Sequence, residues 1–230
     1  MKKVSVFTLA LFAGMAVYAQ SSPQLRTPMP VETRFGIKAG VNMAKFKVGK
    51  DDFPSSIPAP HATSNTSFNA GVFVNVPLSD AIRFQPELLY SGQGSKLSGS
   101  VLGTNYQQTA NLRYLTLPLM FQAQTSSGFF VELGPQFGYL LNAKTENDSP
   151  GASGDKIDIK GYLDKFDFAV NGGIGYLSRM GLGINARYSY GITNVIDVKN
   201  DDAGSDFYTD GELQNQVIQV GLFYQFGANK

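Results

Sequence analysis

Hydrophobic and polar residues alternate through Leu115–Leu141, in two arms joined by the polar segment Ala123–Ser127. A period of two is the signature of a β-strand whose two faces meet different surroundings. The second arm keeps the alternation longer than the five or six residues of a usual globular strand, and a strand tilted across a bilayer needs about nine to eleven. The apolar face is therefore predicted to contact lipid. Its members are Leu115, Leu117, Leu119, Phe121, Phe129, Val131, Leu133, Pro135, Phe137, Tyr139 and Leu141.

The same alternation recurs in six further segments, which with the two arms make eight predicted strands. The six segments are Arg34–Phe46, Ser67–Val76, Ala81–Gln93, Leu163–Tyr176, Gly181–Ile192 and Glu212–Gly227.

Long and short connections between these strands alternate strictly. The predicted long loops are Val48–Thr66, Gly94–Ala110, Ala143–Tyr162 and Thr193–Gly211. The short turns are Pro77–Asp80, Ala123–Ser127 and Leu177–Met180. Outer-membrane barrels have an even strand number, short periplasmic turns and long external loops. The pattern predicts an all-β fold, an eight-stranded antiparallel up-and-down transmembrane β-barrel in the cell outer membrane, with both termini periplasmic.

Charged residues within the strands fall on the face opposite the apolar one. We expect them to form an ionic network in the lumen, because an isolated buried charge costs several kcal/mol. Eight strands enclose roughly enough space for side chains only. A soluble eight-stranded barrel, the alternative, would place apolar residues inside instead. The predicted lumen residues are Arg34, Lys38, Arg83, Glu87, Glu132, Asp167 and Arg187.

Three prolines, Pro86, Pro118 and Pro135, lie inside predicted strands and remove ladder donors there. They lie at similar distances from the short turns. We expect local β-bulges at these positions rather than broken strands.

The N-terminal segment has the features of a cleaved secretory signal peptide. Lys2 and Lys3 precede an apolar run, and small residues precede Gln20. The predicted division is a signal peptide over 1–19, a periplasmic lead-in over 20–32 and the barrel domain over 33–230. An uncleaved anchor helix is the alternative, although the apolar run is short for a span.

Composition narrows the function classes. Without Lys2 and Lys3, 17 of the 19 basic residues remain against 18 acidic residues, so no net charge favours nucleic acid as a partner. The 25 glycines, 17 phenylalanines and 11 tyrosines favour β structure. Cysteine is absent, so an exported chain of this kind would depend on its backbone ladder for stability.

Candidate catalytic and metal-binding residues are few. His61, the one histidine, lies among prolines and serines, and an incidental loop position is the favoured interpretation over a hydrolase or acyltransferase role. An acidic cluster in the last long loop lacks the spacing of a calcium-binding helix-loop-helix, which favours a solvated loop. The cluster comprises Asp197, Asp201, Asp202, Asp206, Asp210 and Glu212. We expect no catalytic residue, no metal and no cofactor.

Two functional classes remain. The first is a non-enzymatic barrel whose external loops contact a surface polysaccharide or another envelope protein, with aromatic loop residues as contact points. These contact residues are Phe53, Tyr106, Phe207 and Tyr208. The second is a small-solute channel.

Four segments, RFGIKAGVNMAKF, RFQPELLYSGQG, YLTLPLMFQ and VELGPQFGYLL, resemble recurring segments of the PorT-like outer membrane β-barrel family of Bacteroidetes. The resemblance implies an eight-stranded outer-membrane barrel, and the name-giving member of the family is linked to protein secretion and gliding. The expected partners are outer-membrane lipid and lipopolysaccharide, the barrel-assembly machinery and other envelope or secretion proteins. Tyr224 and Phe226 resemble the C-terminal signal that the barrel-assembly machinery recognises, except that Gly227–Lys230 follow the last Phe.

Overall fold

The computed structural model describes residues 32–48, 61–101, 104–147, 156–193 and 213–227. The chain divides into two units, Met1–Val31 and Glu32–Lys230, and all described residues belong to the second. The predicted signal peptide and most of the lead-in therefore lie outside the described residues. Within the described residues, no helix is long and apolar enough to cross a membrane.

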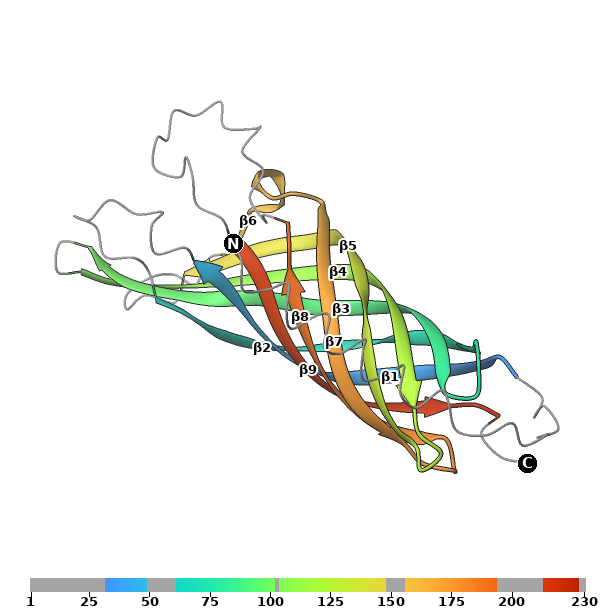
Figure 1. The fold of residues 1–230 in the computed structure, drawn as a ribbon. Helices are drawn as coiled ribbons and strands as arrows, with labels where there is room; N and C mark the ends of the chain where they lie inside the picture. The colour runs from blue at the N-terminus through green and yellow to red at the C-terminus, as the bar shows by residue number, and fades with distance from the viewer. Residues whose placement is uncertain (1–31, 49–60, 102–103, 148–155, 194–212, 228–230) are drawn as a thin grey trace, which may run out of the picture. The chain divides into compact units, whose positions relative to one another are not determined.

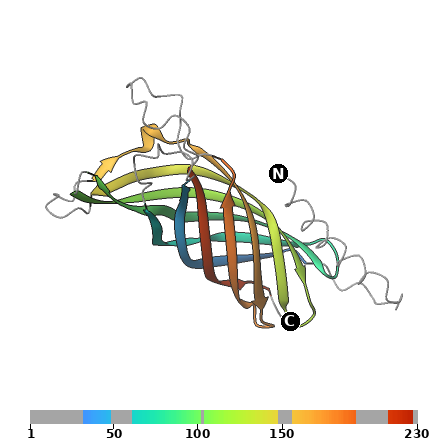
Figure 2. The same cartoon turned by 60° about the vertical axis from the view of Figure 1, so that its left-hand side comes forward.

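Eight long antiparallel strands form a closed barrel, as the alternation predicts (Figure 1). They are β1 (Arg34–Val48), β2 (His61–Pro77), β3 (Ile82–Val101), β4 (Thr104–Gln124), β5 (Phe129–Asn147), β7 (Phe166–Leu177), β8 (Leu182–Gly191) and β9 (Leu213–Gln225). Each strand pairs with its sequence neighbours, and β1 pairs with β9 to close the ring. Figure 2 shows β1, β9, β8 and β7 side by side in the wall.

The side of the barrel built from β3, β4 and β5 is longer than the opposite side. These strands have 20, 21 and 19 residues, whereas β7, β8 and β9 have 12, 10 and 13. A three-residue strand, β6 (Lys156–Asp158), pairs with the far end of β5, and the 3-10 turn η3 (Lys160–Tyr162) follows it.

The prediction of a long loop over Gly94–Ala110 is wrong. Gly94–Val101 and Thr104–Ala110 instead continue β3 and β4 as a paired ladder, which we call the β3–β4 extension. The loops predicted around His61–Thr66 and Ala143–Asn147 are likewise partly strand. Polar residues lie on both faces of the extension, so the sequence there shows no alternation of apolar and polar residues. The backbone hydrogen bonds between the two strands continue all the same.

The bulges predicted at the prolines are also wrong. The β3–β4, β4–β5 and β5–β7 registers are the same on both sides of Pro86, Pro118 and Pro135. The ladder instead lacks two residue pairs beside Pro118 and resumes in the same register, because a missing N–H removes a hydrogen bond without requiring an extra residue. The described register shifts lie elsewhere, between Ser64 and Asn69 in β2 and beside Leu141 in β5.

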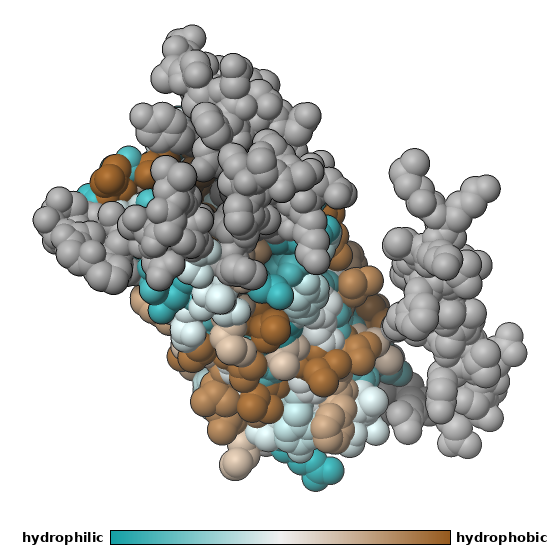
Figure 3. Space-filling model, turned by 90° about the vertical axis from the view of Figure 1, so that its left-hand side faces the viewer, coloured by the Kyte–Doolittle hydropathy of each residue, from teal (hydrophilic) through white to brown (hydrophobic). Residues whose placement is uncertain are grey.

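The outer wall is apolar, as predicted for a lipid-facing surface. Outward residues such as Phe35, Val72, Leu133 and Leu222 are exposed, and Figure 3 shows hydrophobic side chains gathered across the wall. Aromatic pairs lie towards both barrel ends, including Phe129–Tyr176 near the short turns and Tyr139–Phe166 near the long connections. Aromatic girdles at two levels are typical of barrels that span a membrane.

Candidate functional site

The middle of the lumen holds four charged side chains in direct contact. The Arg187 guanidinium on β8 donates to both oxygens of Glu87 on β3, with Nη1–Oε2 and Nη2–Oε1 distances of 2.9 Å. Its Nε donates to Oε1 of Glu132 on β5 at 2.9 Å. Lys38 on β1 contributes Nζ at 2.8 Å from Glu87 Oε1. Two cations and two anions therefore form a neutral set, which we call the lumen ionic network.

Amide side chains complete the coordination of both carboxylates. Gln85 donates to Glu87 Oε1 at 2.8 Å. Gln122 donates to Glu132 Oε2 at 3.1 Å, and Asn185 to Glu132 Oε1 at 3.3 Å. Every carboxylate oxygen of the network thus accepts at least one hydrogen bond. Buried charges persist in a low-dielectric interior only with this kind of compensation.

The network crosses the lumen and is sealed from solvent. The side chains of Arg187 and Glu87 are 0% exposed, and the Lys38 side chain is 5% exposed. Room for the Glu132 carboxylate comes from Gly173 on β7, the register partner of Arg187, where a Cβ would lie 2.9 Å from Glu132 Oε1. The same alternation that sends apolar residues to lipid sends these charges inward, since successive side chains point to opposite faces.

An aromatic cluster adjoins the network towards the short turns. The Phe223 ring packs against Phe73 and Phe130, with ring centroids 5.8 Å and 6.1 Å away respectively. Lys38 Nζ lies 5.8 Å from the centre of the Phe223 ring. Three inward glycines make space for the rings, because a Cβ at Gly36, Gly175 or Gly183 would overlap Phe73, Phe130 or Phe223 respectively.

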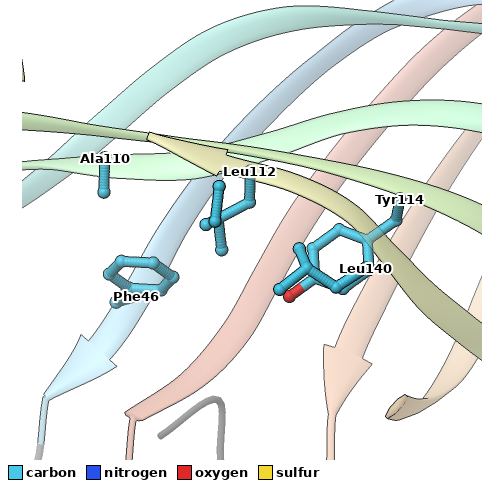
Figure 4. Close-up of a cluster of buried hydrophobic side chains, with 6 residues drawn as sticks. Phe46, Ala110, Leu112, Tyr114 and Leu140 are labelled. Carbon is cyan, nitrogen blue, oxygen red and sulfur yellow. The ribbon is translucent and has the colours of Figure 1, made fainter. Parts of the chain in front are cut away.

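An apolar cluster fills the lumen near the long connections. Phe46 on β1, Leu112 and Tyr114 on β4, and Leu140 on β5 are buried and converge on the barrel interior (Figure 4). Ile159 and Leu163, in the segment around η3, pack against this cluster from the side of the long connections. The lumen is thus occupied by side chains at three successive levels.

The seven predicted lumen charges separate into two sets. Lys38, Glu87, Glu132 and Arg187 join the lumen ionic network, whereas three others lie apart from it. Arg34 and Arg83 lie at the short-turn mouth of the barrel, and Arg83 donates to Asn75 Oδ1 at 3.2 Å. Asp167 lies at the opposite end, where it accepts a hydrogen bond from Thr193 Oγ1 at 2.9 Å.

The other predicted site residues have mixed positions. Phe53, Phe207, Tyr208 and the acidic cluster Asp197–Glu212 lie outside the described residues. Tyr106, predicted in a loop, instead lies in β4, where it pairs with Gly99 of the β3–β4 extension. His61, also predicted in a loop, begins β2 and pairs with Ser98.

The proposed C-terminal signal residues lie on and beside the last strand. Tyr224 on β9 and Phe226 directly after it face outward, with ring centroids 5.2 Å apart. Their role as an assembly signal stays a prediction.

Sequence reasoning missed most uncharged lumen residues. Phe130 and Gln85 follow the inward alternation, so the pattern gave their direction without a role. Leu112 also points inward when the alternation of β4 is continued towards the N-terminus from the predicted strand start at Leu115. Asn75 also follows the inward alternation, but its role as a link between Arg83 and the amides Gln85 and Gln122 depends on register.

The site chemistry is that of a structural interior. The two carboxylates of the lumen ionic network, Glu87 and Glu132, are bound by cations and amides, which leaves them poorly placed as acids or bases for a substrate. Among the residues that the structure describes, no group of three or more His, Cys, Asp or Glu residues could hold a metal ion.

Comparison with known proteins gives a family and a set of similar folds. The model of the outer membrane protein beta-barrel domain matches residues 18–197, most of the chain. No curated protein sequence matches.

Solved structures with a similar fold include three outer-membrane proteins. Neisserial surface protein A is 13% identical, with a TM-score of 0.46 over 84% of this chain and 97% of its own. Ail of Yersinia pestis is 13% identical, with a TM-score of 0.45 over 85% and 99%. OprG of Pseudomonas aeruginosa is 14% identical, with a TM-score of 0.40 over 84% and 95%. At these values the likeness does not extend to function.

Proposed function

Because the chain belongs to the outer membrane protein beta-barrel domain family, we propose that it is a non-enzymatic barrel with a closed lumen, which contacts other envelope components through its long-connection side. Family membership gives its location as the outer membrane. The PorT-like segments support a narrower placement, among the barrels of Bacteroidetes, in which the N-terminal segment 1–19 is removed on export. A role in secretion would be exerted by contact with partner proteins.

One observation carries the closed-lumen proposal, the lumen ionic network. Arg187 on β8 reaches Glu87 on β3 directly, so the two walls of the barrel are joined by a bidentate pair with no exposed side-chain surface. Bidentate arginine–carboxylate pairs have fixed geometry as well as strength. A hydrated solute would have to break this pair and then displace the aromatic cluster.

Planar-bilayer conductance tests the proposal. The full mature chain, refolded and inserted into a lipid bilayer, is expected to give no current above that of protein-free membranes. The Arg187→Ser variant, which removes the bidentate pair, is expected to show brief openings. Heat-dependent migration on a gel confirms that both proteins are folded before insertion. Steady single-channel current from the wild-type chain would contradict the closed lumen.

A small-solute channel is the second candidate. The observation that favours it is the set of buried polar atoms without a protein partner among the described lumen residues, including Asn171 Oδ1 and Asn185 Oδ1. A single row of water molecules along the lumen could form hydrogen bonds with these atoms. The same conductance measurement separates the two candidates, because a channel would conduct before any residue is changed.

Orientation has a direct test, because the chain contains no cysteine. We propose that the short turns and both termini face the periplasm, which is the usual arrangement in outer-membrane barrels. A cysteine at Ser127, in the turn between β4 and β5, is expected to react with an impermeant maleimide only after the outer membrane is opened. A cysteine at Lys156, on β6, should react on whole cells. The reverse labelling pattern would invert the topology.

Partner contact is proposed for the outer end of the β3–β4 extension, where the paired segments Gly99–Val101 and Thr104–Tyr106 continue the wall beyond β2 and β5 (Figure 1). The candidate partners are lipopolysaccharide, the barrel-assembly machinery during insertion, and other envelope or secretion proteins. Co-purification from native outer membranes identifies the stable ones. A variant in which a two-residue turn replaces residues 98–107 is the matched control. Partners retained equally by the two proteins would exclude the extension as the contact surface.

A further inference from the structure

Two arginines at the short-turn mouth lack acidic partners among the described residues. Arg34 begins β1 and Arg83 is near the start of β3, and each is only partly buried. Neither takes part in a salt bridge within the described part of the chain, although the charge of Arg34 acts on Arg83. Two like charges confined at one mouth repel each other, and an anion between them would remove that repulsion.

Asn75 adjoins both arginines, one through strand register and the other through a side-chain hydrogen bond. Arg34 is the register partner of Asn75, and Arg83 Nη1 donates to Asn75 Oδ1 at 3.2 Å. The Nε atoms of both Arg34 and Arg83 are buried without a hydrogen-bond partner. A guanidinium Nε that is buried and unpaired loses its hydration without compensation, which a ligand oxygen could supply.

The interior carboxylates cannot supply that oxygen. Asn75 Nδ2 donates to Gln85 Oε1 at 2.8 Å and to Gln122 Oε1 at 3.2 Å. These glutamines donate in turn to Glu87 and Glu132, whose charges Lys38 and Arg187 already neutralise. A layer of amides therefore separates the mouth arginines from a network that is electrically complete, and the double positive charge of the mouth is left over.

We propose that the short-turn mouth binds a phosphate-class dianion between Arg34 and Arg83. Two guanidinium groups match the charge of a dianion, whereas a single carboxylate would neutralise only one of them. Arginine is the favoured residue for phosphate because its planar fork donates two parallel hydrogen bonds. This site is independent of whether the lumen conducts, since it lies at the mouth and outside the ionic network. The phosphate can come from solution or from a phosphomonoester headgroup.

Titration with inorganic phosphate tests the site. The full mature chain is placed in phosphatidylcholine nanodiscs at low ionic strength, and binding is followed by calorimetry and by 31P NMR line broadening. The wild-type chain should show saturable binding, and Arg34→Gln and Arg83→Gln should each weaken it by about tenfold, the effect expected when one bidentate contact is lost. Arg113→Gln is the matched control, because Arg113 is exposed on β4 and donates to the Tyr90 hydroxyl. It should leave phosphate affinity unchanged.

The outcomes separate a real site from general attraction to a basic protein. Absence of saturable binding to the wild-type chain, or equal affinity in the Arg34→Gln and Arg83→Gln variants, would overturn the proposal. If a glutamine variant fails to show folded migration on a gel, Arg83→Lys keeps the charge and removes the fork, and it should still weaken binding severalfold. Nanodiscs containing phosphatidic acid identify the source: competition with free phosphate assigns the site to a lipid headgroup, and no competition assigns it to soluble phosphate.

Discussion

The lumen ionic network and the apolar cluster occupy the same inward face of the barrel but are stabilised by different interactions. The network joins four charges from β1, β3, β5 and β8, and each charge is buried only because its partners are present. The apolar cluster around Leu112 and Leu140 is stabilised by exclusion of water and close packing. The stability of the lumen ionic network therefore depends on all four charges being present, whereas the apolar cluster loses stability in proportion to the atoms removed.

This difference predicts unequal responses to substitution. A missing charge leaves its partner buried and uncompensated, at a cost that exceeds the value of the pair itself. A missing methyl group in the apolar cluster leaves a cavity whose cost grows with its volume. Four substitutions test this contrast, in order of expected effect.

Arg187→Leu is expected to have the largest effect. It leaves Glu87 and Glu132 facing each other with Lys38 as their remaining cation, and breaking a buried ion pair in this way costs about 3–5 kcal/mol. The free energy of unfolding in urea, measured in lipid vesicles, gives the loss. Arg113→Leu, at an exposed position of β4, is the control and should change stability by under about 0.5 kcal/mol. Equal losses would show that the network is not specially dependent on Arg187.

Leu140→Ala should follow, with a loss of about 3 kcal/mol. Leu140 is fully buried in the apolar cluster, and truncating a buried leucine costs both its transfer free energy and a cavity. Leu117→Ala on the partner strand is the control, because Leu117 faces outward, where lipid tails can fill the space. Urea unfolding again gives both values. A larger loss at Leu117 would reverse the assigned directions of the two side chains.

Gly183→Ala is expected to cost about 2 kcal/mol, within the range for overpacking. Its new methyl group would overlap the Phe223 ring in the aromatic cluster. The measurement is a double-mutant cycle with Phe223→Ala, in which the second substitution should recover part of the loss. Gly172→Ala is the control, since its nearest neighbour would be Leu133 Cδ1 at 3.8 Å. Additive effects of Gly183→Ala and Phe223→Ala would exclude the steric explanation.

Lys156→Gln should have the smallest effect, below about 0.5 kcal/mol. Lys156 on β6 forms an ion pair with Glu146 at 3.5 Å, and its side chain is 59% exposed. The same kind of pair that is essential in the lumen is screened by water here. Unfolding measured at low and high salt should give nearly the same difference. A loss comparable to that of Arg187→Leu would remove burial as the reason for the contrast.

The sequence predicted the eight strands and the two faces of the wall, because alternation with period two survives wherever one face meets lipid and the other meets the lumen. It failed on the β3–β4 extension, where residues such as Ser98 and Gln107 are polar and paired. Strand pairing between polar residues produces no alternation of apolar and polar positions. A pair of polar strands therefore has the same composition as a solvated loop and cannot be told from it by sequence.

Alternation along the strands also predicted that the seven charged side chains point inward, but not which partners they contact. Arg187 and Glu87 are separated by 100 positions, and their contact depends on the stagger of the strands around the ring. Asp167 has the same direction as Glu132 but lies at another level, where Thr193 is its partner. A single sequence determines the direction of a side chain from local alternation, whereas its level depends on the register of every intervening hairpin.

The seam between β1 and β9 has a consequence for biogenesis. Thirteen residue pairs join the earliest strand of the ring to the latest, so no earlier hairpin can substitute for this contact. Until Leu213–Gln225 has been synthesised and delivered, β1 presents an unsatisfied edge that hydrocarbon cannot tolerate. The ring can therefore close only after β9 has been made, and a chain that ends before β9 should not form the closed barrel.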